Sequence, residues 1–484
     1  MAGVVAALGA VLLAGGCAGG TGGGARDGGA PPAAAGRGVP DSVTGLSTFA
    51  LDVDTASYGY ARRSLAEGRL PAPEDVRPEE FVNSFRPGYA PPPDDGFAVA
   101  LDGADGWSLL RVGLATRPAS GERPPAALTF VVDVSGSMAE PGRLDLVKEP
   151  LGLLADRLRG DDAIALVTFS GTAETVLPMT RVGAARERIR ALVDGLETSS
   201  STNVEAGIRA GYDTAVEGHR EGATNRVVLL SDALANTGDT DAEGILERVD
   251  RERRAYGITL FGVGVGGEYG DAFMERLADR GDGHTTYVAT SAQARKVFVD
   301  QLPAHVELRA RDAKAQVAFD PGTVESFRLV GYENRAAADR DFRDDRVDGG
   351  EIGAGHTVTA LYAVRLRPGA GVRVATATVR RLDPATRAPR ERAGAVDAAA
   401  LGAPLWGPGH DSLQVTVLAA CFAERLRGTA LPGTPGLRGL AGHAEALAAR
   451  ARSASVQELA RAIRQADALG GGAGEVGAGD PYAG

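Results

Sequence analysis

Two kinds of hydrophobic pattern follow one another along the chain. From about residue 126 to residue 300, short apolar runs alternate with segments whose apolar residues recur every three or four positions, as buried strands and helices do. The run Leu-Thr-Phe-Val-Val-Asp at residues 128–133 is typical of a central parallel strand buried on both faces. Further strands are predicted at residues 163–169, 226–231, 258–265 and 286–289, and helices at 144–158, 189–196, 204–212 and 273–278. The alternation predicts an α/β fold, with a doubly wound, mainly parallel sheet of the Rossmann-like kind.

The pattern on either side of this region is different. Residues 315–319, 327–332, 357–364 and 372–380 alternate between apolar and polar positions, as antiparallel strands with one solvated face do. Residues 97–101 and 107–115 flank a turn-rich loop and predict a hairpin. We expect this hairpin to pair with the strands of residues 305–382, so that the α/β domain is inserted into, or flanked by, an antiparallel β-rich domain. Helical spacing at residues 411–426 and 456–469 predicts C-terminal helices.

The N-terminal segment has the features of an export signal. Residues 4–14 are an apolar run of secretory length, too short to span a bilayer as a helix. Ala14-Gly15-Gly16 then precede Cys17, and small residues before a cysteine are typical of a bacterial lipoprotein signal, in which that cysteine is lipidated. A plain secretory signal or an uncleaved anchor is the alternative.

These patterns divide the chain into six parts. They are a lipoprotein-like signal peptide at 1–17, a flexible linker at 18–45, an N-terminal module at 46–125, the α/β domain at 126–300, a β-rich and helical extension at 301–470, and a disordered tail at 471–484. The linker and the tail are rich in small residues and have little periodicity, so they cannot bury a core.

Composition narrows the function classes. The 484 residues carry a net charge of −11, which argues against nucleic acid as the main partner. Cys17 and Cys421 are the two cysteines of the chain, so there is no disulfide framework and no cysteine-rich metal site. Cys421 lies in an apolar helical pattern, and we expect a buried structural thiol there.

Three polar segments of the α/β region lie where strands end or helices begin. Asp133-Val-Ser-Gly-Ser137 follows the first strand, Ser199-Ser-Ser-Thr-Asn203 precedes a helix, and Ser231-Asp232 follows the strand at residues 226–230. Ligands of an open α/β sheet bind outside the carboxyl ends of its strands. We therefore expect the three segments to meet at one edge of the sheet.

The side chains of these segments suit one hard divalent cation, which takes about six oxygen ligands and keeps several waters. Ser135 and Ser137 can face one side of an extended loop, and Thr202 adds a third hydroxyl oxygen. Asp133 and Asp232 roughly neutralise the ion through water or through hydrogen bonds to the hydroxyls, which leaves a position open for an external carboxylate. Taken alone, the first segment would also fit a helix N-cap, so the other two segments carry the metal prediction.

In their order and on these elements, the five residues resemble the metal-ion-dependent adhesion site of von Willebrand factor type A and integrin I domains. The resemblance implies that Ser135, Ser137 and Thr202 bind the metal directly, and that Asp133 and Asp232 act indirectly. It implies Mg²⁺, with Mn²⁺ or Ca²⁺ as alternatives. Such domains usually have glycine after the last aspartate, where this chain has Ala233; alanine would strain the loop if that position requires a positive φ.

Four further segments extend the resemblance to YfbK-type bacterial lipoproteins, which combine an N-terminal module, a von Willebrand factor type A domain and a C-terminal extension. The segments are FALDVDTASY (49–58), RPEEFVNSF (77–85), RLVGYENR (328–335) and GGEIGAGHTVTALY (349–362). The resemblance covers about residues 47–469, and it implies an exported protein that is lipid-anchored in the bacterial cell envelope.

Other signals favour structural roles. Gly262, Gly264 and Gly267 spell G-x-G-x-x-G, but they lie in or after a late strand, where close helix packing explains them better than a nucleotide loop. The acidic segment 341–351 lacks the spacing of a calcium loop, and we interpret it as a solvated loop with ion pairs. Neither a P-loop nor a G-x-S-x-G elbow is present, and we interpret His356 as structural, so we expect no enzyme.

The leading hypothesis is an envelope-tethered, divalent-metal-dependent protein-binding module. Its partners would be a protein that offers an Asp or Glu carboxylate and, through the lipid anchor, the membrane; we expect no nucleic acid and no small-molecule substrate. The alternative is a structural or assembly factor of the envelope, whose metal site is occupied intramolecularly by an acidic segment such as residues 341–351. The sequence does not identify the partner, the metal, the oligomeric state or the biological process.

Overall fold

The computed structural model describes residues 45–470, apart from residue 52, residues 105–108, 120–122, 233–241 and 302–305, parts of 267–282, and the single positions 346, 348, 370, 385, 403, 407 and 408. The expected signal peptide, nearly all of the expected linker and the expected tail lie outside the described residues, and Cys17 with them. Among the described residues, no helix combines the length and the hydrophobicity that a membrane span requires.

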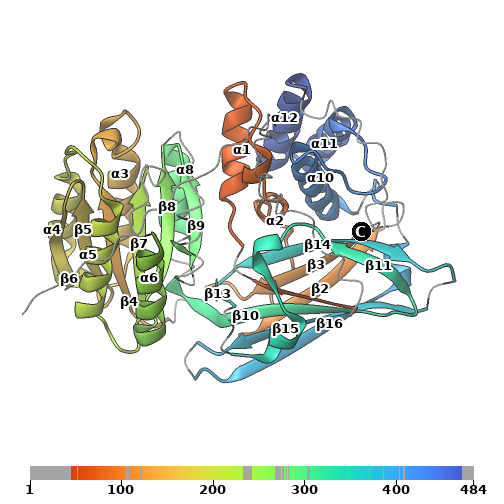
Figure 1. The fold of residues 1–484 in the computed structure, drawn as a ribbon, viewed down its shortest axis with the longest axis horizontal. Coiled ribbons are helices and arrows are strands. Elements are labelled where there is room, and N and C mark those ends of the chain that lie inside the picture. Colours follow the sequence, from red (N-terminus) through yellow and green to blue (C-terminus); the bar gives the residue numbers. More distant parts are fainter. Residues whose placement is uncertain are drawn as a thin grey trace, which may run out of the picture. The chain divides into compact units, whose positions relative to one another are not determined.

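The α/β region forms one six-stranded sheet with the order β6-β5-β4-β7-β8-β9 (Figure 1). Its strands are β4 (Ala126–Asp133), β5 (Ala163–Phe169), β6 (Ala173–Arg181), β7 (Thr224–Ser231), β8 (Thr259–Val265) and β9 (His284–Val288). Only β6 pairs in the antiparallel sense, with β5 at the edge of the sheet. The predicted doubly wound, mainly parallel sheet is therefore confirmed, whereas the edge strand β6 was not predicted.

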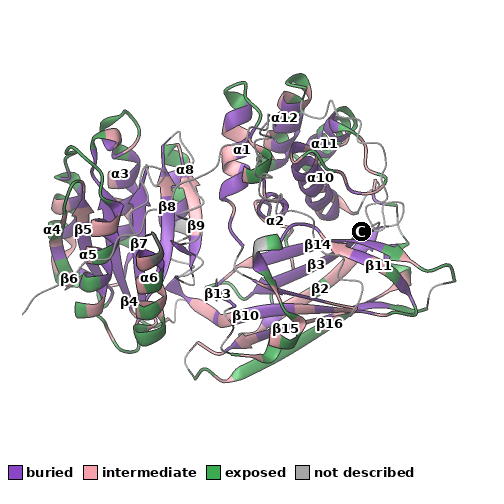
Figure 2. Ribbon diagram, in the orientation of Figure 1, coloured by how far each residue is buried: buried purple, intermediate pink, exposed green. Residues whose placement is uncertain are grey.

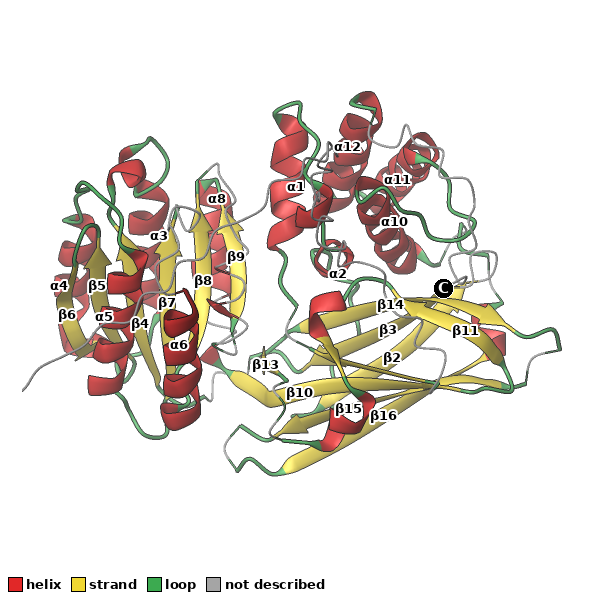
Figure 3. Ribbon diagram, in the orientation of Figure 1, coloured by secondary structure: helices red, strands yellow, loops and turns green. Residues whose placement is uncertain are grey.

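Helices cover both faces of this sheet (Figures 1 and 3). On one face, α3 (Asp145–Arg157) and α4 (Val182–Asp194) share an apolar core with Phe130 and Val132 of β4. On the other face, α5 (Val204–Glu217) and α6 (Ala242–Tyr256) share a core with Val131. The helix α5 approaches the sheet closely because residue 211 is glycine: a Cβ there would lie 2.3 Å from Val131 Cγ2. Helix α6 was not predicted from the sequence.

Two antiparallel sheets form the β-rich part. One has the order β12-β1-β10-β15-β16, with β13 also paired to β10, and the other has the order β11-β14-β3-β2. Strand β1, before the α/β domain, pairs with β10 after it, and β3 pairs with β14 in the same way. The expected insertion is therefore confirmed. The strands are β1 (Leu46–Ala50), β2 (Phe97–Ala104), β3 (Leu109–Thr116), β10 (Leu308–Phe319), β11 (Val324–Leu329), β12 (Ala336–Ala337), β13 (Gly350–Gly353), β14 (Thr357–Leu366), β15 (Arg373–Leu382) and β16 (Pro389–Asp397).

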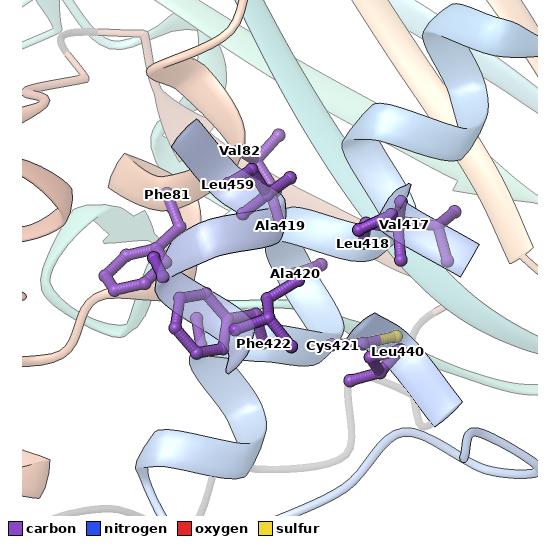
Figure 4. Packing of buried hydrophobic residues seen from close by; sticks show 14 of the residues in the cluster. Phe81, Val82, Val417, Leu418, Ala419, Ala420, Cys421, Phe422, Leu440 and Leu459 are labelled. Atoms are coloured by element: carbon purple, nitrogen blue, oxygen red, sulfur yellow. The ribbon is translucent and has the colours of Figure 1, made fainter. Parts of the chain in front are cut away.

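The remaining helices enclose a core of their own. They are α1 (Ala56–Ala66), α2 (Pro78–Asn83), α10 (Asp411–Leu426), α11 (Leu437–Ala451) and α12 (Ala454–Ala468). Helix α10 is buried along most of its length (Figure 2), and its Phe422 packs edge-on against Phe81 of α2, with ring centroids 5.8 Å apart (Figure 4). Cys421 is buried in this core, as expected, and burial raises the pKa of its thiol. Helix α11 was not predicted.

Shorter helical segments join these elements. They are α8 (Ser291–Arg295), the π-helical turn η5 (Lys296–Gln301), and the 3-10 turns η2 (Pro73–Asp75), η3 (Gly136–Ala139), η6 (Glu333–Arg335), η7 (Asp339–Arg343) and η8 (Ala398–Leu401).

Candidate metal-binding site

The candidate site lies at the carboxyl edge of the parallel sheet. Strand β4 is flanked by β5 on one side and by β7 on the other, which makes its carboxyl end a point where the order of the strands reverses. Loops diverge at such a point and leave a crevice where ligands bind. Asp133 is the last residue of β4, and Ser231 is the last residue of the neighbouring β7. The first and third polar segments therefore meet there, as expected.

Asp133 holds the first loop in place. Its side chain is fully buried, Oδ1 accepts a hydrogen bond of 2.8 Å from the Ser135 N–H, and Oδ2 accepts one of 2.5 Å from the Ser231 hydroxyl. Burial raises the pKa of Asp133, and the hydrogen bonds from Ser231 and Ser135 partly oppose that shift. Because both oxygens are engaged with the two loops, Asp133 can fix the position of the serine at 135 and add negative charge beneath it.

The hydroxyl groups lie in a short row with Asp232. The Oγ atoms of Ser135 and Ser137 are 3.1 Å apart, and the Ser137 hydroxyl donates a hydrogen bond of 2.9 Å to Asp232 Oδ1. Neighbouring oxygens around an octahedral Mg²⁺ with bonds of about 2.1 Å are separated by about 3 Å. The two observed spacings are close to that separation and are also ordinary hydrogen-bond distances, so the row of oxygens is compatible with a divalent cation.

The second polar segment is tied to the first. The Ser199 N–H donates a hydrogen bond of 2.6 Å to the Val134 carbonyl, and the Asn203 N–H donates one of 2.6 Å to the Ser170 carbonyl after β5. Asn203 Oδ1 also caps helix α5 by accepting from the Ala206 N–H at 3.0 Å. Thr202 lies exposed in this loop. The structure thus brings the loop of Thr202 to the Asp133–Ser137 loop, while the predicted role of its hydroxyl stays a prediction.

A positively charged side chain that sequence reasoning missed, Arg143, belongs to the same cluster. Arg143 donates from Nη1 to Asp232 Oδ2 at 2.5 Å and to the Ser137 carbonyl at 3.2 Å, and its Nη2 lies 2.6 Å from Glu140. The position of an arginine six residues after Ser137 has no sequence signal of its own. Its charge partly offsets the two aspartates, so the cluster is less negative than the sequence suggests.

Two other sequence expectations concern this edge. Gly262 and Gly264 lie within β8, and a Cβ on Gly262 would lie 2.6 Å from the sulfur of Met274. This close packing confirms their structural role. Gly267 and Ala233 lie outside the described residues, so the expected strain at Ala233 stays a prediction.

The acidic segment 341–351 forms ion pairs and hydrogen bonds with both the β-rich part and the α/β domain. Arg380 of β15 lies 2.7 Å from Asp345, and Lys314 of β10 donates to the Asp344 carbonyl at 2.8 Å. Glu351 is buried and lies 2.9 Å from Arg226 of β7. The expected ion pairs are confirmed, whereas residues 350 and 351 belong to the buried strand β13 and not to a solvated loop. In the part of the chain that the structure describes, no group of three or more His, Cys, Asp or Glu side chains is arranged to hold a metal; the candidate site differs from such a group because it includes hydroxyl oxygens.

A second polar cluster also escaped the sequence analysis. Asp54, His284 and His356 line a cavity of about 280 Å³. Asp54 accepts hydrogen bonds from Thr285 of β9, and His284 Nδ1 lies 3.8 Å from Asp54 Oδ1. The two imidazole rings stack with centroids 5.9 Å apart. Burial lowers the pKa of each histidine to about 3, so both rings are neutral at physiological pH, which suits the structural role expected for His356.

Comparison with known proteins agrees with this architecture. Residues 127–300 match the von Willebrand factor type A domain family, residues 306–396 match the family of the C-terminal region of the uncharacterized protein YfbK, and residues 39–107 match a family described as von Willebrand factor. The chain thus has a von Willebrand factor type A fold next to a domain of the YfbK C-terminal type.

The relatives differ in how much of the chain they match. YfbK of Escherichia coli (strain K12) is 38% identical over 339 residues, which are 66% of this chain and 58% of that protein, so the match spans less than two thirds of its length. Inter-alpha-trypsin inhibitor heavy chain H3 of Homo sapiens is 33% identical over 165 residues, 32% of this chain and 18% of that protein. Among solved structures, a von Willebrand factor type A protein from Catenulispora acidiphila covers 78% of this chain and 96% of its own, with 16% identity and a TM-score of 0.48.

Proposed function

Because this YfbK-like chain carries a von Willebrand factor type A domain, we propose that it is a divalent-metal-dependent protein-binding module that captures an Asp or Glu carboxylate of its partner. The observation that carries the proposal is the row of oxygens at the edge of the parallel sheet. Ser135 Oγ and Ser137 Oγ are 3.1 Å apart, close to the spacing of neighbouring ligands around Mg²⁺, and Asp232 Oδ1 lies 2.9 Å from Ser137 Oγ, where it can supply charge.

The proposal gives each of the five residues a role. Ser135, Ser137 and Thr202 would hold the cation with neutral oxygens, and Asp133 and Asp232 would supply charge without saturating it. The bound cation would supply a Lewis-acidic position for one external carboxylate oxygen. Asp133 keeps Ser135 in place through the 2.8 Å hydrogen bond to its backbone N–H, and a ligand held by a packed second residue is preorganised for binding.

Two carboxylates of the segment 341–351 are already paired, which favours an external carboxylate over these two. An assembly factor whose site is filled by the segment 341–351 would need a free carboxylate in that segment. Asp345 instead pairs with Arg380 at 2.7 Å, and Glu351 pairs with Arg226 at 2.9 Å in a buried position. These contacts support a partner from outside the segment.

We also propose that the chain works outside the cytoplasm, exported and anchored to the bacterial envelope membrane through a lipid on Cys17. The apolar run of residues 4–14 and the small residues before Cys17 support this placement. Radiolabelled palmitate should be incorporated into the wild-type chain and not into Cys17→Ala; equal labelling of the two would contradict the anchor.

The metal reading is tested by thermal unfolding of the full chain in EDTA and in Mg²⁺. A cation at 100 times its Kd should stabilise the fold by about 2.7 kcal/mol. Ser137→Ala should lose this gain, whereas Ser326→Ala, which removes a hydroxyl from β11 in the antiparallel sheet, should keep it. Equal melting temperatures of the wild type in EDTA and in saturating Mg²⁺ would refute a metal-dependent function.

The carboxylate reading is tested on a coated surface. The wild type should be retained on poly-L-glutamate in Mg²⁺ and released by EDTA, and Ser137→Ala should not be retained. Poly-L-glutamine is the matched control, because it has the same backbone and length without the charge. Retention on both polymers, or retention that survives EDTA, would contradict carboxylate capture at the metal.

A further inference from the structure

Arg143 places a permanent positive charge inside the candidate metal site. Its guanidinium contacts Asp232 Oδ2 at 2.5 Å and the Ser137 carbonyl at 3.2 Å. The opposite oxygen of the same carboxylate accepts the Ser137 hydroxyl at 2.9 Å. Asp232 is therefore shared between the hydroxyl row and the guanidinium.

A divalent cation bound by Ser135 and Ser137 would lie close to this guanidinium. Both cations draw on the charge of Asp232, and like charges a few ångströms apart repel strongly where the local dielectric constant is low. The Arg143 side chain is 15% exposed and that of Asp232 is fully buried, so water screens this repulsion only weakly. A stronger ion pair between Arg143 and Asp232 therefore lowers the affinity of the site for metal, and bound metal weakens that ion pair.

We propose that Arg143 is a built-in competitor of the divalent ion: it holds Asp232 when the metal is absent, and it sets how tightly the site binds metal. The proposal rests on the proposed metal-dependent function and adds how that site is regulated. The guanidinium has a second acceptor ready, because its Nη2 already pairs with Glu140 at 2.6 Å, and the Glu140 side chain is 64% exposed. Metal binding would shift Arg143 from Asp232 toward Glu140 at the solvent side.

A glycine next to Arg143 leaves space for its side chain. Gly266, just after β8, has φ +101°, and a Cβ there would lie 3.0 Å from Arg143 Nε, so a larger residue would push the guanidinium away. The Gly266 carbonyl accepts a hydrogen bond of 2.5 Å from Arg63 of helix α1, which fixes the backbone against which Arg143 lies. Gly266 thus leaves room for the Arg143 side chain beside Asp232.

The test determines the affinity of the full chain for Mn²⁺ in the absence of other ligands. The electron paramagnetic resonance signal of the free ion gives its concentration at each step of the titration. Arg143→Gln and Arg143→Met remove the charge with side chains of different shape, and both should bind Mn²⁺ at least about tenfold tighter than the wild type. Arg143→Lys keeps the charge and should stay near the wild type. Arg190→Gln, which breaks an exposed ion pair with Asp156 on the same domain, is the control and should bind as the wild type does.

A second measurement guards against effects on folding. In EDTA the neutral variants should melt below the wild type, because buried Asp232 has lost its cation, and Mn²⁺ should raise their melting temperatures more than it raises that of the wild type. Unchanged or weaker Mn²⁺ binding by both neutral variants, with native circular dichroism, would overturn the competition and leave the metal site intact. Absence of Mn²⁺ binding in the wild type and in every variant would overturn the proposed function as well.

Discussion

The pair of buried histidines predicts how the stability of the fold depends on pH. Burial lowers the pKa of His284 and of His356 from the ordinary 6.5 to about 3. Arg226 and Arg335 add to the shift of His284, while Asp54 opposes that of His356. An unfolded chain protonates both rings below pH 6.5, whereas the folded chain keeps them neutral. Stability is therefore complete above pH 6.5 and falls as the pH drops toward 3.

The size of the effect follows from the two pKa values. A pH of 5 is about 1.5 units below the pKa of a histidine in the unfolded chain. Each pH unit below that pKa changes the free energy of unfolding by about 1.4 kcal/mol. Each buried histidine should therefore lower the free energy of unfolding by about 2 kcal/mol between pH 7.5 and pH 5. Glu79 and Glu80 oppose this loss of stability at low pH, because burial raises the pKa of each carboxyl. Protonation of such carboxyls makes the folded protein more stable as the pH falls.

A comparison of variants removes the contribution of the glutamates. Wild type and His284→Gln are unfolded with urea at pH 7.5 and at pH 5 in EDTA, and circular dichroism follows the transition. The variant should be less stable at pH 7.5, and the gap should narrow by about 2 kcal/mol at pH 5. His219→Gln removes an exposed ring and is the control for loss of a histidine outside the buried pair. A gap for His284→Gln that is the same at both pH values would refute a neutral buried imidazole.

Two further predictions concern groups buried elsewhere. Glu351→Gln should cost about 3–5 kcal/mol in urea unfolding, because Arg226 at 2.9 Å and Arg311 at 3.3 Å then lose their shared carboxylate in a buried position; a cost below that of the exposed Asp156→Asn would contradict this. The raised pKa of Cys421 predicts a thiol that iodoacetamide alkylates only after denaturation, and mass spectrometry of its peptide that finds rapid alkylation of the native chain would show that the core of α10 opens.

The long periodic segments were predictable because burial imposes one period on each of them. Strand β4 is apolar at nearly every position since helices cover both faces of its sheet, and that pattern is visible without neighbours. Strand β6 escaped prediction because it is an exposed edge strand with a mixed pattern. Helix α11 escaped because alanine and glycine make up much of it, and small residues leave little contrast between its buried and exposed faces.

The candidate site was predictable only as far as chain order determines it. Asp133 and Asp232 follow adjacent strands, so the sheet brings their loops together whatever the loops contain. Arg143 could not be predicted, because its approach to Asp232 depends on the course of the turn after η3 and on the space left by Gly266. The pairing of Asp54 with Thr285 was hidden for a similar reason: the two residues are 231 positions apart, and no local pattern links them.

Because of these long-range contacts, metal binding should be measured on the full chain and not on the isolated α/β domain. The α/β domain is tied to the rest of the chain by the buried ion pair of Arg226 with Glu351 and by two part-buried hydrogen bonds, from Thr285 to Asp54 and from Arg63 to the Gly266 carbonyl. A fragment of residues 126–300 would keep Arg226, Thr285 and Gly266 and lose all three partners. Loss of the Arg226–Glu351 pair and of the two hydrogen bonds would remove contacts that hold β7, β8 and β9, so we expect the fragment to relax first at these strands. Because Arg143 lies against Gly266, its hold on Asp232 would loosen in the fragment, and metal should bind more tightly there than in the full chain.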